Sequence, residues 1–121
     1  MVCVGTRLLI TDNTGALEAA CIKILGSTSG SARLGDRLIV AIKRVIPDKK
    51  IKAHEVRTCV LVRTRRRTHR RNGMSISFST NAVVLIDHRR NPLGSRIFGA
   101  VAQELRTRKQ MKLLTIAQHV V

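Results

Sequence analysis

Aromatic side chains are almost absent from this sequence: it contains two phenylalanines, Phe78 and Phe98, and no tryptophan or tyrosine. Proteins that read unpaired nucleotides usually stack the bases on aromatic rings, so this scarcity disfavours a single-strand reader. A protein that binds the backbone or the shape of structured RNA needs no such platform. The composition therefore argues against the first class and leaves the second open.

Carboxylates are also scarce. Lys and Arg number 23 against 7 Asp and Glu, which gives a net charge of +16 on 121 residues. Repulsion of this size destabilises the compact state unless a partner neutralises it. Arg outnumbers Lys 16 to 7, and the planar guanidinium favours fixed, bidentate phosphate contacts over the diffuse attraction of a Lys-rich tail. These charges predict nucleic acid as the partner.

Features that would place the protein in other classes are missing. The cysteines are odd in number and form no Cys-x-x-Cys pair; they are Cys3, Cys21 and Cys59. This pattern disfavours a disulfide framework and a zinc site. It favours cysteines that act as small apolar core residues in a reducing compartment. The histidines are scattered and match no metal-ligand or catalytic pattern. The longest aliphatic run, 82–86, is far shorter than the ~20 residues that span a bilayer, and the first residues do not resemble a secretory signal. We expect no enzyme activity, no metal, no cofactor and no membrane partner.

The most informative segment runs from Arg63 to Arg71 and carries six arginines and no carboxylate. It leads into Asn72-Gly73, a pair typical of two-residue type I′ hairpin turns, in which both residues take positive φ. Strand-like apolar sequence lies on both sides, so residues 63–80 are predicted to form a projecting β-ribbon. The turn would also fix the register, pairing Arg71 with Met74, Val62 with Val83 and Val60 with Leu85. The alternative interpretation of the run is a localisation signal or a solvated surface.

Short apolar runs between turn residues predict five strands. They cover residues 8–10, 20–25, 38–46, 56–62 and 82–86. In the third strand Leu38, Val40 and Ile42 alternate with other residues and form its inner face. A turn at 12–15, a Ser/Gly-rich connection at 26–35 and a basic loop at 48–52 separate the strands. The pattern predicts a mainly β fold, namely a small five-stranded antiparallel β-barrel.

The sequence after residue 87 has a different character. Residues 88–94 read as a loop, and residues 100–110 are predicted to form a short helix with Val101 and Leu105 on one face. Residues 111–117 are predicted to return as an apolar strand or extended segment. We therefore expect one RNA-binding domain, 1–121, with the ribbon at about 63–80 and a C-terminal short-helix region at about 92–121.

Two segments have a partial likeness to motifs of other functions. Residues 12–15, Asp-Asn-Thr-Gly, differ from the Asp-Thr-Gly of aspartic proteases by the inserted Asn13, and no second copy supplies the paired carboxylate. Residues 26–35 contain neither the Walker spacing nor Gly-x-Gly-x-x-Gly. Both segments are interpreted as plain turns or loops.

Many segments, in order and nearly throughout the chain, resemble one family, the universal large-ribosomal-subunit protein number fourteen of bacterial and organellar type. The segments are 12–16, 21–26, 34–36, 42–43 with 46–47, 60–64, 72–73 followed by Phe78, Asn81 and Val84, 92–99, and 104–106. Residues 113–119 resemble the ending of mitochondrial members. The sequence departs from the family pattern at Cys59, where Gly or Ala is usual, and at Ala100, where many relatives have Pro.

The resemblance implies a structural constituent of the large ribosomal subunit that is embedded in ribosomal RNA at the face meeting the small subunit. It implies as partners large-subunit ribosomal RNA, small-subunit ribosomal RNA across the interface, neighbouring ribosomal proteins including protein nineteen, and a ribosomal silencing factor. Ser95, Arg96 and Lys112 match positions on that intersubunit or silencing-factor face. The implied location is the ribosome, with the mitochondrion favoured over the bacterial cytoplasm and the plastid.

Charge and resemblance together give a set of candidate phosphate contacts. They are Lys43, Arg44, Lys49, Lys50, Lys52, Arg63, Arg65, Arg66, Arg67, Arg70, Arg71, Arg89, Arg90 and Arg96. Phe98 is expected to anchor its segment in apolar packing while Arg96 stays available to a phosphate or an acidic protein. The rival hypothesis is a free nucleic-acid chaperone or single-strand binder on an OB-like barrel, which would need aromatic residues on a barrel face.

Overall fold

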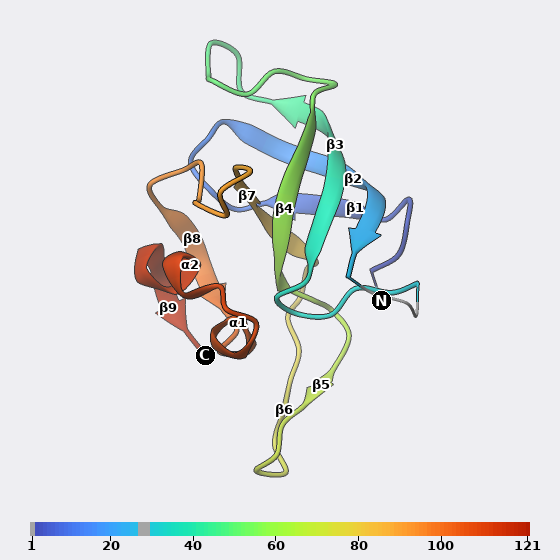
Figure 1. Ribbon diagram of the computed structural model, residues 1–121, viewed down its shortest axis with the longest axis vertical. Helices are drawn as coiled ribbons and strands as arrows, with labels where there is room; N and C mark the ends of the chain where they lie inside the picture. The colour runs from blue at the N-terminus through green and yellow to red at the C-terminus, as the bar shows by residue number, and fades with distance from the viewer. Residues whose placement is uncertain (1, 27–29) are drawn as a thin grey trace.

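Five strands close into a barrel in the computed structural model, which describes residues 2–26 and 30–121 (Figure 1). The order around the barrel is β1 (Arg7–Ile10), β2 (Ala16–Leu25), β3 (Arg37–Val45), β4 (Val56–Arg63) and β7 (Ala82–Ile86). The predicted five-stranded barrel is therefore confirmed. Four of its neighbouring pairs are antiparallel, but β1 and β7 close the barrel as a parallel pair, with Leu9 opposite Ala82.

The interior of the barrel follows the alternation that the sequence predicts. Leu38, Val40 and Ile42 of β3 are fully buried, as predicted. Cys59 from β4 and Cys21 from β2 join the same cluster, which confirms these two cysteines as core residues. Burial raises the pKa of both thiols, which keeps them protonated at neutral pH. Residues 27–29 of the predicted 26–35 connection lie outside the described residues.

A second hydrophobic cluster covers the outer faces of β4 and β7. Every residue of β7 is buried, because alternate side chains enter the barrel and the others face the C-terminal region. Val60, Val62 and Val84 on this outer side pack with residues from the end of the chain, among them Leu105 and Leu113. Burying one such side chain is worth roughly 1.5–3 kcal/mol. The second cluster therefore fixes the C-terminal region against one side of the barrel (Figure 1).

The predicted ribbon is present, but its turn is different. β5 (Thr68–His69) and β6 (Ser75–Ile76) pair in a finger that extends from the barrel (Figure 1). The Arg70 N–H donates to the Met74 carbonyl at 2.8 Å and the Gly73 N–H donates to the Arg70 carbonyl at 3.1 Å. Only Gly73, at φ 84°, has positive φ in this turn. The loop therefore contains three residues, and the expected two-residue type I′ turn is wrong.

The longer loop also changes the register of the barrel strands. It takes one more residue from the first arm, so Leu61 lies opposite Val83 and Cys59 lies opposite Leu85. The predicted pairs of Val62 with Val83 and Val60 with Leu85 are therefore wrong by one residue. A bulge between Leu61 and Arg63 adjusts the strand where it leaves the barrel.

The C-terminal region contains short helices, as predicted, but the predicted bounds are only partly right. β8 (Ile97–Val101) pairs in parallel with β9 (Ala117–Val120), and α1 (Glu104–Thr107) and α2 (Met111–Ile116) lie between them. Of the predicted helix at 100–110 only Glu104–Thr107 is helical, and the predicted strand at 111–117 is helix up to Ile116. Helices of four and six residues are not stable alone. Burial of Leu105 and Leu113 in the second cluster, rather than local periodicity, decides their positions.

No helix among residues 2–26 and 30–121 is long and apolar enough to cross a membrane. Within these same residues, no group of three His, Cys, Asp or Glu side chains is placed to hold a metal ion.

Candidate nucleic-acid interface

Four arginines of the ribbon are accessible to solvent. Arg65, Arg66, Arg67 and Arg71 are exposed, and none of them forms an ion pair with a described residue. The backbone beneath them is fixed, because the Arg65 N–H donates to the Asn81 side-chain oxygen at 2.9 Å. The ribbon therefore presents several unpaired guanidinium groups on an ordered hairpin, an arrangement that suits phosphate oxygens.

Arg70 has a partner within the protein. Its guanidinium forms two hydrogen bonds to the Glu104 carboxylate, at 2.7 and 3.4 Å, and one to the backbone oxygen of Val121 at 2.7 Å. Both side chains of the ion pair are about three quarters buried. Arg70 therefore ties the ribbon to α1, and most of its donor capacity is already used.

Arg63 is also turned inward. Its Nε donates to the Ala100 carbonyl at 2.6 Å, and one terminal nitrogen donates to the Phe98 carbonyl. Burial lowers the pKa of its guanidinium. Gly99 lies directly under this group, and a β-carbon there would be 2.4 Å from the terminal nitrogen. Arg63 links the end of β4 to β8, so the structure gives it a scaffolding contact in place of an open phosphate site.

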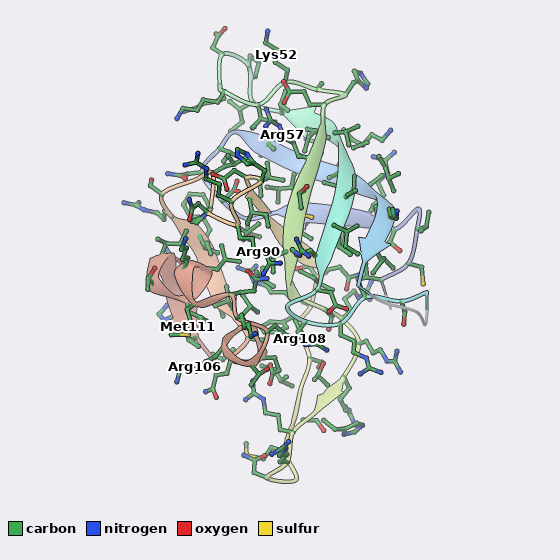
Figure 2. All side chains as sticks on the ribbon, in the orientation of Figure 1. Lys52, Arg57, Arg90, Arg106, Arg108 and Met111 are labelled. Atoms are coloured by element: carbon green, nitrogen blue, oxygen red, sulfur yellow. The ribbon has the colours of Figure 1, made fainter. Side chains whose placement is uncertain are left out.

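The basic candidates around β3 lie at the other end of the barrel from the ribbon. Lys43 and Arg44 are exposed near the end of the strand, and Arg44 is 3.6 Å from Glu18 in an exposed ion pair. Lys49, Lys50 and Lys52 are exposed in the following loop, and Figure 2 shows Lys52 at the end opposite the ribbon. The candidates therefore do not form one patch. The ribbon arginines and this basic loop form two separated groups on one barrel.

Ser95 is held in place by Asn13. The Ser95 N–H donates to the Asn13 side-chain oxygen at 2.9 Å, and the Asn13 amide donates to the Ser95 hydroxyl at 2.8 Å. Lys49 and Lys50 line the same hollow, of about 270 Å³, as these two residues. Arg96 follows Ser95 and is exposed. The basic loop and the predicted intersubunit segment are therefore neighbours, although they are far apart in the sequence.

The expected anchor of this segment is wrong. Phe98 is 46% exposed, whereas the adjacent Ile97 is fully buried in the second cluster. The reason is the alternation of β8, which turns Ile97 toward the barrel and Phe98 outward. Phe98 lines a shallow hollow with Ile46 and Lys49, so an apolar ring is available beside the basic loop.

A buried carboxylate supports this junction. Asp12 accepts hydrogen bonds from the Thr14 hydroxyl at 2.6 Å, the Thr14 N–H at 3.2 Å and the Leu85 N–H at 3.0 Å. Burial raises its pKa above the usual 3.8, although these hydrogen bonds act in the opposite direction. The turn that the sequence predicts at 12–15 is therefore also the joint that fixes Asn13, and through it Ser95.

The remaining candidates face the C-terminal helices. Arg89 and Arg90 are exposed on a turn that Asp87 holds by accepting the N–H groups of Arg89 and Asn91, each at 2.9 Å. The Lys112 ammonium donates to the Asn91 side-chain oxygen. The structure thus places Lys112 with Arg89 and Arg90 in one hollow, while Ser95 lines a different one.

Several residues at these positions were not predicted from the sequence. Arg33 lines a hollow with Arg66 and Arg67 at the root of the ribbon, and Lys109 and Gln110 line the hollow beside Arg90. Lys109 lies near the end of the helix that the sequence predicts at 100–110. The charge of Lys109 is evident in the sequence, but the arginines that line the same hollow come from a distant segment.

A family model described as ribosomal protein L14p/L23e matches residues 1–121. This match covers the ribbon, the basic loop and the segment around Ser95, and it agrees with the resemblance seen in the sequence. The family is structural rather than enzymatic. The chain therefore belongs to the ribosomal protein L14p/L23e family, a structural protein of the large ribosomal subunit.

Proposed function

We propose that the protein binds large-subunit ribosomal RNA through the two separated groups of cations at opposite ends of its barrel. The observation that carries this proposal is the arrangement of unpaired charge. In the described part of the chain only Arg44, Arg57, Arg70 and Arg108 form ion pairs, out of 23 Lys and Arg residues. The others need counter-charge from outside the protein, and an RNA fold that surrounds the barrel supplies it at both ends.

We further propose that the segment around Ser95 and Arg96, together with Lys112, contributes to the face that meets the small subunit. The family resemblance supports this assignment, and so does the geometry that holds Ser95 rigidly beside the basic loop. Small-subunit RNA, protein nineteen and a silencing factor are the partners proposed for this region. The resemblance of residues 113–119 supports a mitochondrial ribosome, and imaging of the tagged protein against a mitochondrial marker tests that location.

Two measurements test the RNA-binding proposal. The tagged protein should sediment with large subunits and with joined ribosomes in a lysate. In RNA-binding assays, replacing Arg65, Arg67 and Arg71 by Ser should lower the slope of log K against log salt by about 0.7–0.9 for each phosphate that the variant no longer neutralises. The barrel should keep its stability, because these side chains form no ion pair within the described residues.

A matched control removes the same charge elsewhere. Arg7, Lys23 and Arg106 are exposed and are not among the predicted contacts. Replacing these three should change the slope much less than the ribbon substitution does. Equal slopes for the two triple variants would mean diffuse attraction by net charge, and recovery of the protein only as a free species would refute the ribosomal role.

The rival single-strand binder finds little support. Phe78 is half-buried against the second hydrophobic cluster, and Phe98 is 46% exposed. Binding of successive unpaired bases needs several rings along one path. A single exposed phenylalanine does not provide that path.

A further inference from the structure

A small hollow lies where the turn after β7 meets the turn between α1 and α2. Its volume is about 260 Å³. It is lined by Arg89, Arg90, Lys109, Gln110, Met111 and Lys112. Figure 2 shows Arg90 and Met111 on the side of the barrel where the two helices pack. The hollow is distinct from the ribbon and from the basic loop, and two segments far apart in the sequence build it.

Cations dominate this hollow. Four of its six lining residues are Lys or Arg, and none of these four forms an ion pair with a described residue. The nearby Asp87 accepts the backbone N–H groups of the turn, so it holds the turn in shape and does not line the hollow. The carboxamide oxygen of Asn91 satisfies only one donor of Lys112. The charge in the hollow is therefore of one sign.

Gln110 supplies an independent observation. This residue is only 6% exposed, yet among residues 2–26 and 30–121 its side-chain amide forms no hydrogen bond. Its backbone is satisfied, because its N–H donates to Leu105 and its carbonyl accepts from Leu113. Fully buried polar side-chain atoms in the described residues all have partners, so the amide of Gln110 is not fully enclosed, and this hollow is the space that the residue lines. A nearly buried amide without a protein partner beside this hollow is a donor available to a ligand.

We propose that this hollow binds one phosphodiester group of ribosomal RNA, with Arg90 and Lys109 neutralising the charge and the Gln110 amide donating to a phosphate oxygen. The inference rests on the proposed RNA binding and adds a specific site to it. The volume is below the roughly 300–1,000 Å³ of pockets for larger ligands, so a single small group fits. A protein partner would need an apolar contact area, and Met111 is the one apolar residue among those lining the hollow.

The substitutions that test this site must preserve its backbone. Arg90 and Lys109 have φ of 64° and 62°, a region that Asn tolerates better than most residues. The double variant Arg90→Asn with Lys109→Asn removes both charges and keeps the turns. The control variant Lys23→Thr with Arg106→Gln removes the same charge from exposed strand and helix positions outside the hollow.

The assay is the salt dependence of binding to a large-subunit RNA fragment that holds the wild-type protein. Removal of one phosphodiester interaction should lower the slope by about 0.7–0.9 in the double variant. The control variant should keep the wild-type slope. An unchanged slope in the double variant, or an equal decrease in the control variant, would overturn the proposal. It would also be overturned if the double variant lost binding to an acidic protein partner while its RNA binding stayed unchanged.

A second measurement does not depend on RNA. Inorganic phosphate is titrated into the ¹⁵N-labelled full chain, and the backbone amide signals of residues 109–112, which every variant retains, are followed. They should shift to saturation in the wild type and in the control, but not in the double variant or in Gln110→Glu, whose carboxylate would repel the anion. Absence of the shift in the wild type would overturn the site. A normal shift in a protein that binds no ribosomal RNA would instead refute the proposed function and the RNA ligand.

Discussion

The contact of Arg63 with β8 should make this residue essential to stability rather than to RNA binding. Arg63 donates from β4 to the carbonyls of Ala100 and Phe98, and so connects the barrel to the C-terminal region. Arg63→Ala removes both hydrogen bonds and leaves the two carbonyls facing a gap. The change therefore weakens the connection where the second hydrophobic cluster begins.

The size of the effect follows from the two bonds. A hydrogen bond to a charged group contributes about 1.5–3 kcal/mol. The bond to Ala100 is partly buried and the bond to Phe98 is exposed, so the lower half of the range applies to each bond and the total is about 3–4.5 kcal/mol. A domain of this kind has a free energy of unfolding of roughly 5–15 kcal/mol. Arg63→Ala should therefore remove a substantial part of it.

Urea unfolding of Arg63→Ala measures this decrease in stability, and hydrogen exchange locates it. The Val121 N–H donates to the Val101 carbonyl at 2.9 Å and should exchange faster in the variant, because β8 is no longer connected to β4 by these bonds. Arg66→Ala is the matched control, since its side chain is exposed on the same ribbon. It should change stability by less than about 0.5 kcal/mol.

Gly99 adds a test of the contact itself. Gly99→Ala places a β-carbon 2.4 Å from the Arg63 terminal nitrogen and also strains a backbone at φ +80°. In Arg63→Ala the steric part disappears, so Gly99→Ala should cost less there than in the wild type, and the double-mutant cycle should show coupling. Additive costs would refute the contact. If Arg63→Ala leaves stability unchanged and instead lowers the salt slope of RNA binding, Arg63 is a phosphate contact after all.

Three other outcomes are expected. Sulfate or ribosomal RNA should raise the melting temperature of the isolated protein, because anions reduce the repulsion of a +16 chain; equal melting in chloride and sulfate at one ionic strength would contradict this. Arg96→Glu should leave large subunits assembled but weaken subunit joining or silencing-factor binding about tenfold, ~1.4 kcal/mol. Gradients at falling magnesium measure the joining, and binding assays measure the affinity for the factor. Wild-type values in both assays would remove Arg96 from the intersubunit face. Burial raises the pKa of Asp12 above 3.8, so the folded state keeps this proton to higher pH than the unfolded state does. The stability of the wild type relative to Asp12→Asn should therefore decline as pH rises from about 4 through the raised pKa, and then level off. A stability difference in urea unfolding that stays constant between pH 3 and 7 would refute this.

The sequence predicted the barrel because its strands alternate. Leu38, Val40 and Ile42 mark one inward face, and turn residues separate the strands at regular intervals. Periodicity could not show that β7 is buried on both sides, since a continuous apolar run gives no preferred face. The second hydrophobic cluster depends on contacts with residues near the end of the chain, and these contacts have no local signal.

The errors in the secondary structure have a related cause. Asn-Gly favours a two-residue turn, but the same pair also fits a three-residue loop that ends in a glycine with positive φ, and the second is the one that matches the barrel register. In the C-terminal region the helices are too short for their periodicity to be read. Pairing of β8 with β9 and burial of Leu105 and Leu113 override the local preferences there.

The candidate site was predicted at the level of charge but not of individual side chains. Six arginines in one run look equivalent in a sequence, yet Arg63 and Arg70 bond to residues 34 to 51 positions away, while the other four remain unpaired. The partners of Arg63 are backbone carbonyls, which every residue carries, so no sequence pattern marks them. The separation of scaffolding from binding arginines therefore appears only when the chain is folded.

Three of the seven carboxylates lie at junctions between parts of the protein, and this position helps to explain the charge of the surface. Asp36 pairs with Arg108, Glu104 pairs with Arg70, and buried Asp12 bonds to Thr14 and Leu85. Each of these bonds joins parts of the protein, since they connect the start of β3 to the turn after α1, the ribbon to α1, and the first turn to β7. Carboxylates at these junctions hold the ribbon and the C-terminal region in fixed positions on the barrel. The outward cations are then preorganised for a polyanion, and binding does not require ordering of the groups that carry them.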